Sequence, residues 1–222
     1  VGSEMCIRDR IYTVATAHLD TVWSWDFEKT VSKYIYNTLV DNFKLFNKYK
    51  TYKFNFEGSY RYELMEEYYP ELFAEMKKYV ESGRWNVCGS AFENGDTNIP
   101  SPEALFRNIL FGNSYFDKTF GKRSKDIFLP DCFGFGWALP SIAHHSNLLG
   151  FTTQKLAWGG AYGVPFDIGK WYGSDGNYIY ANTNPHDYYF TLTQLRNWNF
   201  VQKKLKAVSY THLRAHETAA NL

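Results

Sequence analysis

Apolar and polar positions along the chain follow two periods. Short runs of apolar and β-branched residues predict buried strands, whereas longer stretches with apolar residues three or four positions apart predict amphipathic helices. The first run, Ile11–Ala17, is followed at once by the polar residues His18 and Asp20. The other expected strands are Tyr52–Phe56, Trp85–Cys88, Asp126–Pro130 and Phe151–Leu156.

Helical spacing fills the intervals between these runs. Pro102 is expected to begin a helix, and Gly83 and Gly150 to end helices, because proline suits the first turn and glycine suits the residue after the last turn. Strands that alternate with helices favour an α/β fold with a parallel sheet. The expected helices are Thr30–Tyr49, Ser59–Glu81 as one helix or two, Pro102–Phe120 and Leu139–Leu149.

The two ends of the chain show neither period. Val1–Arg10 lacks the continuous apolar run that a signal peptide needs, and Val208–Leu222 is equally without pattern. We therefore expect that both stretches are foreign to the protein, that residues 11–207 are its native part, and that the true N-terminus is missing. His212 and His216 lie in the foreign tail and are left out of the site.

Charge and composition narrow the class of protein. The chain has 24 Lys and Arg against 23 Asp and Glu, so it lacks the basic excess that nucleic-acid binding needs. It has no run of about 18 apolar residues, so no membrane span is expected. Three cysteines are too few for a disulfide framework, which favours the cytoplasm as the compartment. Aromatic residues make up 19% of the chain, and they suit a protein core as well as the apolar face of a sugar.

The candidate chemistry begins with His18, Asp20 and Asp131. Residues i and i+2 of a strand point to the same face, so His18 and Asp20 would converge as a pair of zinc ligands does. A plain hydrogen bond between the two explains this short pattern without a metal. Asp131 follows the expected strand Asp126–Pro130, and chemistry gathers at the carboxyl ends of parallel strands. It would then face the same rim as the first pair, unless it is a turn aspartate.

Other acidic residues have more than one interpretation. Glu93 and Asp96 lie in a polar loop after an expected strand, where they could face the pocket or lie in a solvated turn. Asp26 and Glu28 could support the site, but we interpret them as polar residues that open the next helix, where negative charge is favourable.

Four longer motifs follow one another along the chain. They are HLDTVW at His18–Trp23, GSAFENGDTN at Gly89–Asn98, PDCFGFGWALP at Pro130–Pro140 and TTQKLAWGG at Thr152–Gly160. Together they resemble glycoside hydrolase family 38, the class II α-mannosidases. The resemblance extends over roughly Ile11 to Lys206, and several long motifs in the right order make it far more specific than the His-x-Asp pair alone.

The resemblance implies a role for each matching residue. His18 and Asp20 match two zinc ligands of the family. Asp131 matches the aspartate that is both a zinc ligand and the catalytic nucleophile. Trp23 and Phe133 match aromatic residues that line the sugar site.

The resemblance also implies a fold and an activity. The fold is a parallel seven-stranded β/α barrel-like domain, of which this chain would hold an incomplete part. The activity is that of a zinc-dependent retaining α-mannosidase, with one Zn²⁺ ion and a mannose-containing glycan as substrate. Lys155 lies near a position where some members use arginine for the sugar hydroxyls, so it is a candidate for substrate binding.

Two parts of the family's site have no match in the native part of the chain. Family members take a histidine as fourth zinc ligand, and an aspartate as general acid, from farther downstream. We interpret His144 and His145 as helix-face residues and His186 as a loop residue, so we expect the chain to be inactive alone. The alternatives are a metal-dependent carbohydrate deacetylase and a non-catalytic sugar-binding module. Linkage preference and oligomeric state stay open.

Overall fold

The computed structural model describes residues 15–157 and 168–183. Its strands form a three-stranded sheet in the order β1-β2-β3 and a four-stranded sheet in the order β4-β5-β7-β6. Paired strands are parallel except for the antiparallel pair β6 and β7. The strands are β1 Ala15–Ala17, β2 Phe54–Glu57, β3 Trp85–Cys88, β4 Asp126–Phe128, β5 Gly150–Thr152, β6 Ile168–Tyr172 and β7 Tyr178–Asn182.

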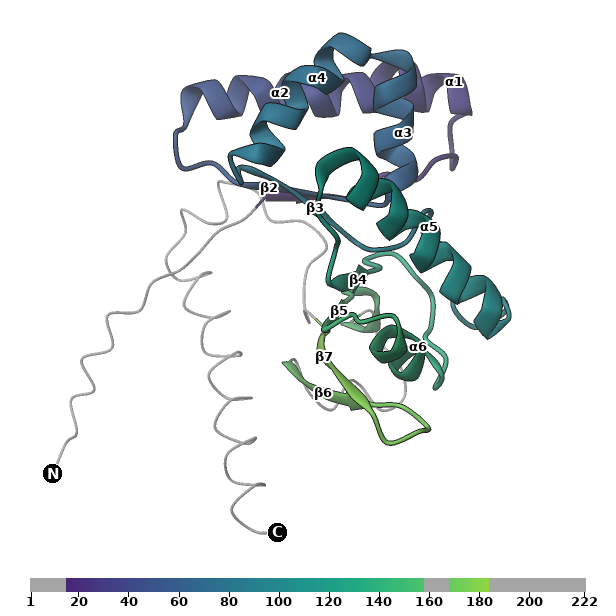
Figure 1. Cartoon of the computed structure of the whole chain (residues 1–222). Coiled ribbons are helices and arrows are strands. Elements are labelled where there is room, and N and C mark those ends of the chain that lie inside the picture. Colours follow the sequence, from purple (N-terminus) through teal and green to yellow (C-terminus); the bar gives the residue numbers. More distant parts are fainter. Residues whose placement is uncertain (1–14, 158–167, 184–222) are drawn as a thin grey trace, which may run out of the picture.

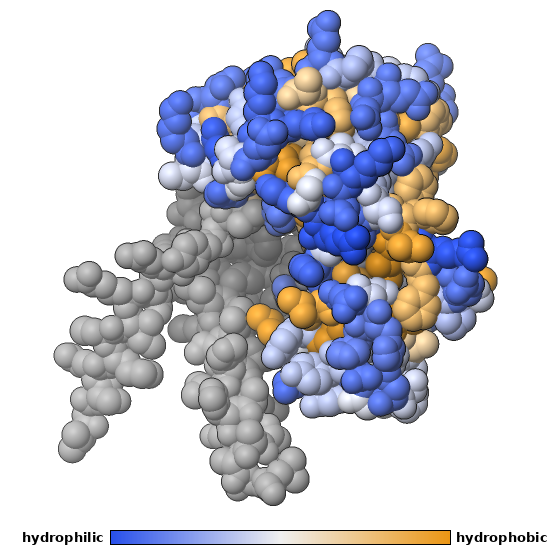
Figure 2. Space-filling model, viewed as in Figure 1, coloured by the Kyte–Doolittle hydropathy of each residue, from blue (hydrophilic) through white to orange (hydrophobic). Residues whose placement is uncertain are grey.

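Helices connect these strands and cover the first sheet. The helices α1 to α4 lie together on one side of β2 and β3 (Figure 1). Their outer surface is mostly polar (Figure 2), as expected for amphipathic helices on a sheet. The elements are α1 Phe27–Lys29, the π-helical segment η1 Thr30–Ile35, α2 Tyr36–Lys48, α3 Ser59–Tyr68, α4 Pro70–Glu81, α5 Pro102–Phe120, α6 Leu139–His145 and the 3₁₀ turn η2 Lys155–Ala157.

A large aromatic core holds the first sheet and its helices together. Trp85, Phe56, Phe46 and Tyr62 are fully buried. The Trp85 indole N–H donates to the Tyr62 hydroxyl oxygen at 3.0 Å, and the Tyr62 hydroxyl donates to the Phe56 carbonyl oxygen at 2.8 Å. The polar groups of Trp85 and Tyr62 therefore each have a hydrogen-bond partner, as their burial requires. A second cluster, which includes Phe151, packs around β4, β5 and β7.

The two sheets meet where β3 ends and β4 begins. The Ser90 N–H donates to the Asp126 carbonyl oxygen at 2.9 Å, and the Gly89 N–H donates to Asp126 Oδ1 at 3.1 Å. Helix α5 passes very close to this junction, because a Cβ atom on Gly112 would lie 2.1 Å from the Ser90 carbonyl oxygen. Only glycine fits there, so this contact helps to fix the second sheet against the first.

Several expected elements are confirmed. The strand Trp85–Cys88 and the helix Pro102–Phe120 have the predicted bounds. Ser101 caps α5 by accepting a hydrogen bond from the Ala104 N–H, and Gly121 ends it with φ +62°. Residues 59–81 form two helices, which separate where Pro70 begins α4.

Several predicted bounds are wrong: β2 spans Phe54–Glu57 instead of Tyr52–Phe56, and β4 ends at Phe128 instead of Pro130. Helix α6 ends at His145 instead of Leu149, and Asn147 has φ +58°, which no continuing right-handed helix allows. Gly150 therefore begins β5 and does not end the helix. That strand ends at Thr152 instead of Leu156, because the chain turns into η2.

The α/β fold with parallel sheets is confirmed, whereas one parallel seven-stranded barrel is not seen in residues 15–157 and 168–183. The strands there belong to two sheets, and β6 is antiparallel to β7. The sequence analysis did not anticipate this pair. A tight turn, closed by a 2.8 Å hydrogen bond from the Gly173 N–H to the Asn177 carbonyl oxygen, joins the two strands, as an antiparallel pair allows.

Some expectations concern parts of the chain that the structure does not describe. The two ends that we expect to be foreign, Val1–Arg10 and Val208–Leu222, lie outside the described residues, and so does His186. Within the described residues, no helix has both the length and the apolar composition of a membrane span.

Candidate active site

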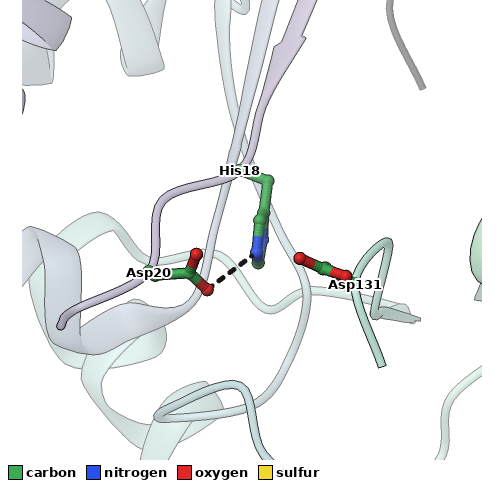
Figure 3. Close-up of side chains that lie close together, drawn as sticks. All are labelled: His18, Asp20 and Asp131. Carbon is green, nitrogen blue, oxygen red and sulfur yellow. Dashed lines mark hydrogen bonds and ion pairs between the residues drawn. The ribbon is translucent and has the colours of Figure 1, made fainter. Parts of the chain in front are cut away.

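His18, Asp20 and Asp131 come together beside the carboxyl ends of β1 and β4. Each offers one ligand atom, and these atoms all lie within 4.8 Å of one another. His18 Nε2 lies 3.2 Å from Asp20 Oδ1. Figure 3 shows the Asp131 carboxylate on the other side of the same imidazole ring. The sequence analysis expected these three residues to share one rim, and the structure brings them together there.

Local structure explains why His18 and Asp20 face the same way. Leu19, between them, is buried in the first core, which leaves both neighbours directed away from that core. The Leu19 carbonyl oxygen accepts a 2.7 Å hydrogen bond from Nε of the buried Arg61. The backbone between the two candidate ligands is thus held from α3.

A pocket of about 220 Å³ opens onto this cluster. Phe133 is one of the residues that line it, and this residue is 81% exposed. Trp23 is not part of the lining; it is exposed and packs edge-on against Trp25. The residues that line the pocket are His18, Asp20, Asn94, Gly95, Asp96, Leu129, Asp131, Cys132 and Phe133.

Lys155 contacts two of the predicted site residues. Its ammonium group forms an ion pair with Asp131 Oδ1 and lies 4.5 Å from the centroid of the Phe133 ring. Lys155 begins η2, which follows β5, and β5 pairs with β4, the strand that precedes Asp131. The Lys155 ammonium group therefore lies beside the carboxylate that we expect to react, against two residues that line the pocket.

Glu57 is a site residue that the sequence analysis missed. It is the last residue of β2, it is fully buried, and its Oε1 is hydrogen-bonded to His18 Nδ1. The Asn94 side-chain amide also donates to this oxygen, at 2.7 Å. The signal that could have found it was the single acidic residue at the end of the apolar strand Phe54–Glu57.

The His18–Glu57 contact changes the ionisation of both groups. Burial raises the pKa of Glu57 above its usual value, although the hydrogen bond and charge of His18 oppose this. Burial alone would lower the pKa of His18, but the hydrogen bond and charge of Glu57 outweigh it, so this pKa is raised. The two side chains form a strongly linked pair beside the pocket.

The two acidic residues of the polar loop have different contacts. Glu93 forms an ion pair with Arg61 at 2.7 Å and accepts a hydrogen bond from the Thr21 hydroxyl. Asp96 lines the pocket and accepts hydrogen bonds from the N–H groups of Asn98 and Ile99, which lower the pKa of Asp96. Both carboxylates thus hold loop backbone or neighbouring side chains in place.

The remaining candidates have structural contacts. Asp26 caps α1, where its Oδ1 accepts a hydrogen bond from the Lys29 N–H at 2.9 Å. The interpretation of Asp26 as a helix-opening residue is confirmed. His144 and His145 lie in α6, and His145 Nε2 contacts Asp175 Oδ2 at 2.8 Å.

The three clustered residues fit a divalent metal ion. One imidazole nitrogen and two carboxylates form a donor set that suits zinc, and the donor atoms lie close enough to share one ion. His18 is bonded through Nδ1 to a buried carboxylate, which leaves Nε2 for the cluster. This pairing of imidazole with a carboxylate is typical of metal-ligating histidines.

Comparisons with known proteins match this chain to α-mannosidases. α-Mannosidase G of Dictyostelium discoideum is 33% identical over 81% of this chain, and an α-mannosidase of Saccharomyces cerevisiae is 33% identical over 84%. The chain spans 16% and 17% of the length of these two relatives.

A solved structure supports the fold. The crystal structure of an α-mannosidase from Enterococcus faecalis V583 matches with a TM-score of 0.67 and 24% identity, over 76% of this chain and 19% of that one. The family model described as the glycosyl hydrolases family 38 N-terminal domain matches residues 9–221. A match over nearly the whole sequence shows that this chain belongs to glycosyl hydrolase family 38.

Proposed function

We propose that this chain is part of a zinc-dependent retaining α-mannosidase that removes terminal mannose residues from glycans. The observation that carries the proposal is the convergence of His18, Asp20 and Asp131 on one point beside a pocket. The α-mannosidase relatives support mannose as the sugar. Since the chain spans about a sixth of their length, the proposal concerns the whole protein.

Asp131 is the proposed nucleophile. One of its carboxylate oxygens bonds to the anomeric carbon of mannose while the glycosidic C–O bond breaks, and the departing oxygen takes a proton from a carboxylic acid. Water then attacks the same carbon with help from that acid's conjugate base, which releases mannose with retained configuration and frees Asp131. When bound, zinc would supply Lewis-acid binding of sugar hydroxyls.

His18 and Asp20 are the proposed partners of Asp131 as metal ligands. His18 would bind through Nε2, because Nδ1 is bonded to Glu57. Phe133 and Trp23 are proposed to offer exposed aromatic faces to the apolar side of the sugar. Lys155 is proposed to bind a sugar hydroxyl, since its ammonium group lies beside Asp131 at the pocket wall.

The proposed mechanism also needs a general acid and a fourth metal ligand. Glu93 and Asp96 are the acidic loop residues nearest to this role, but both hold neighbouring groups in place. We propose that the acid and the fourth ligand come from parts of the protein beyond the described residues. The 222-residue chain alone should then show no turnover. We further propose that β1 to β7 belong to one barrel-like domain that those parts complete.

The test compares variants of the full-length protein on an aryl α-mannoside. Asp131→Ala should abolish release of the aryl group, and His18→Ala should lower the zinc bound per protein. The control is Asp41→Asn, at an exposed site in α2 where Asp41 pairs with Lys44. Wild-type activity in Asp131→Ala would sink the nucleophile assignment. Mannose binding without turnover in the wild type would favour the sugar-binding alternative, and release of acetate from acetylated sugars would favour the deacetylase.

A further inference from the structure

Parallel pairing places Glu57 next to the first candidate ligand. In the register of β1 and β2, Ala17 lies opposite Phe56. His18 and Glu57 therefore follow at adjacent positions where the two strands end, although 39 residues separate them along the chain. The pairing of the two strands therefore determines the contact between His18 and Glu57.

The environment of Glu57 is costly for a carboxylate. The side chain is fully buried at the end of an apolar strand, and Oε1 is bonded to His18 Nδ1 and Asn94. Oε2 is also buried, and it has no hydrogen-bond partner among the described residues. A buried carboxylate with an unpaired oxygen destabilises a fold, and an apolar side chain of similar size is often better tolerated.

Fold stability therefore does not explain why a glutamate occupies position 57, whereas the orientation of His18 does. A neutral imidazole has one protonated nitrogen and one with a free lone pair. A carboxylate that accepts from Nδ1–H leaves the lone pair on Nε2, which lies on the side of Asp20 and Asp131. It also makes Nε2 a stronger donor to a metal ion.

A second contact from the same region supports this arrangement. Arg61, in the first turn of α3, donates to the carbonyl oxygen of Leu19, between His18 and Asp20. Gly58 separates β2 from α3 with φ +73°, and a Cβ atom there would lie 2.6 Å from Arg61 Nη1. The end of β2 and the start of α3 thus hold both the ring of His18 and the backbone that follows it.

We infer that Glu57 is a positioning residue, which holds His18 in the tautomer and orientation that direct Nε2 to the metal. The inference rests on the proposed function, because it assumes that His18 binds the ion. Glu57 does not contact the sugar or the reacting atoms in this account. Its effect on activity passes through His18, so metal affinity and the His18 tautomer are the proper readouts.

The experiment uses the full-length protein and has two parts. NMR of ¹⁵N-labelled histidine in the metal-free protein should show that neutral His18 carries its proton on Nδ1. Titration with Zn²⁺ should then show weaker binding by about 10- to 100-fold in Glu57→Ala. Glu57→Gln keeps an acceptor oxygen for Nδ1–H, so its loss should be smaller than that of Glu57→Ala and the tautomer should be kept.

The matched control is Asp126→Asn. Asp126, the first residue of β4, is also a carboxylate at one end of a strand, and it accepts hydrogen bonds from the Gly89 N–H and the Ser124 hydroxyl. The Zn²⁺ affinity of Asp126→Asn should stay within about threefold of wild type, because asparagine keeps the acceptor oxygen for both donors.

Three results would overturn the inference: a wild-type His18 protonated on Nε2, unchanged zinc affinity in both Glu57 variants, or an equal loss in Asp126→Asn. Should Glu57→Ala fail to fold, Glu57→Gln and the wild-type tautomer decide the question. A full-length wild type that binds no Zn²⁺ would count against the proposed function. In that case the tautomer in the metal-free protein still tests the role of Glu57.

Discussion

Among the described residues, two clusters pair a histidine with a carboxylate, and they differ in what surrounds the pair. His18 and Glu57 are held at the end of the first sheet, where the carboxylate is fully buried and one of its oxygens has no partner among the described residues. His145 and Asp175 pair on the surface, where Asp175 also accepts hydrogen bonds from Ser141 and Asn177.

Because of this difference, we interpret the His18–Glu57 cluster as part of a candidate site and the His145–Asp175 cluster as a structural contact. The Asp175 carboxylate is satisfied by its neighbours and joins α6 to the turn between β6 and β7. The Glu57 carboxylate is partly unsatisfied, and its histidine lines a pocket together with Asp20, Asp96 and Asp131. A histidine and an acid in contact are therefore weak evidence of function until burial, unpaired atoms and an adjoining pocket are considered.

The largest effect is expected from Asp131→Ala in the full-length protein. Loss of the nucleophile should lower kcat by about 10⁴-fold or more, because the covalent intermediate cannot form. Steady-state kinetics on an aryl α-mannoside measures this loss. An activity loss below tenfold would remove Asp131 from its proposed role and weaken the contrast between the two clusters.

His18→Ala and His145→Ala test the two clusters directly. His18→Ala should raise the dissociation constant for Zn²⁺ by more than about 100-fold, beyond the effect of a supporting residue, because it removes a proposed ligand. His145→Ala should leave zinc binding unchanged. Isothermal titration calorimetry of both variants measures the zinc affinity. An equal loss of affinity in the two variants would contradict the proposed difference between the two clusters.

Lys155→Met is expected to have an intermediate effect. It removes the ammonium group beside Asp131 but keeps an apolar chain against Phe133. We expect kcat/KM to fall by about 10- to 100-fold, as for the loss of a hydrogen bond to a charged group. Zinc content should be unchanged. Unaltered kcat/KM would show that Lys155 does not bind the sugar.

The smallest effect is expected from Asp175→Asn, with a fall in Tm of no more than about 3 °C and unchanged zinc binding.

The hydrogen bonds from Asn177, Ser141 and His145 lower the pKa of Asp175 below its usual range. A lowered carboxyl pKa stabilises the fold above the unfolded pKa, and this contribution is lost as the pH falls through the folded pKa. Thermal melts below pH 4 should therefore differ less between wild type and variant than melts at pH 7. A difference in Tm between wild type and variant that grows as the pH falls would contradict this stabilising role of ionised Asp175.

The sequence predicted best where a signal is local. The bounds of α5 follow from Ser101, Pro102 and Gly121, and the placement of Asp131 after a strand follows from the apolar run before it. The end of α6 near Asn147 was harder to predict, because an asparagine in the left-handed conformation has no strong sequence signal. The hairpin of β6 and β7 was not anticipated at all.

The contacts of Glu57 and Arg61 could not be predicted from the sequence, because they depend on pairing between distant segments. Glu57 reaches His18 only because β1 and β2 pair in one parallel register. Arg61 reaches Leu19 across 42 residues of sequence. Neither contact follows from the period of apolar residues around it, which predicts only a strand and a helix.

The most direct test of the central claim is a crystal structure of the protein grown with zinc, with diffraction measured on both sides of the zinc absorption edge. The account predicts one strong anomalous peak bound by His18 Nε2 and by carboxylate oxygens of Asp20 and Asp131, with His18 Nδ1 still bonded to Glu57. A peak bound elsewhere, or these three side chains without an ion in zinc-saturated protein, would contradict it.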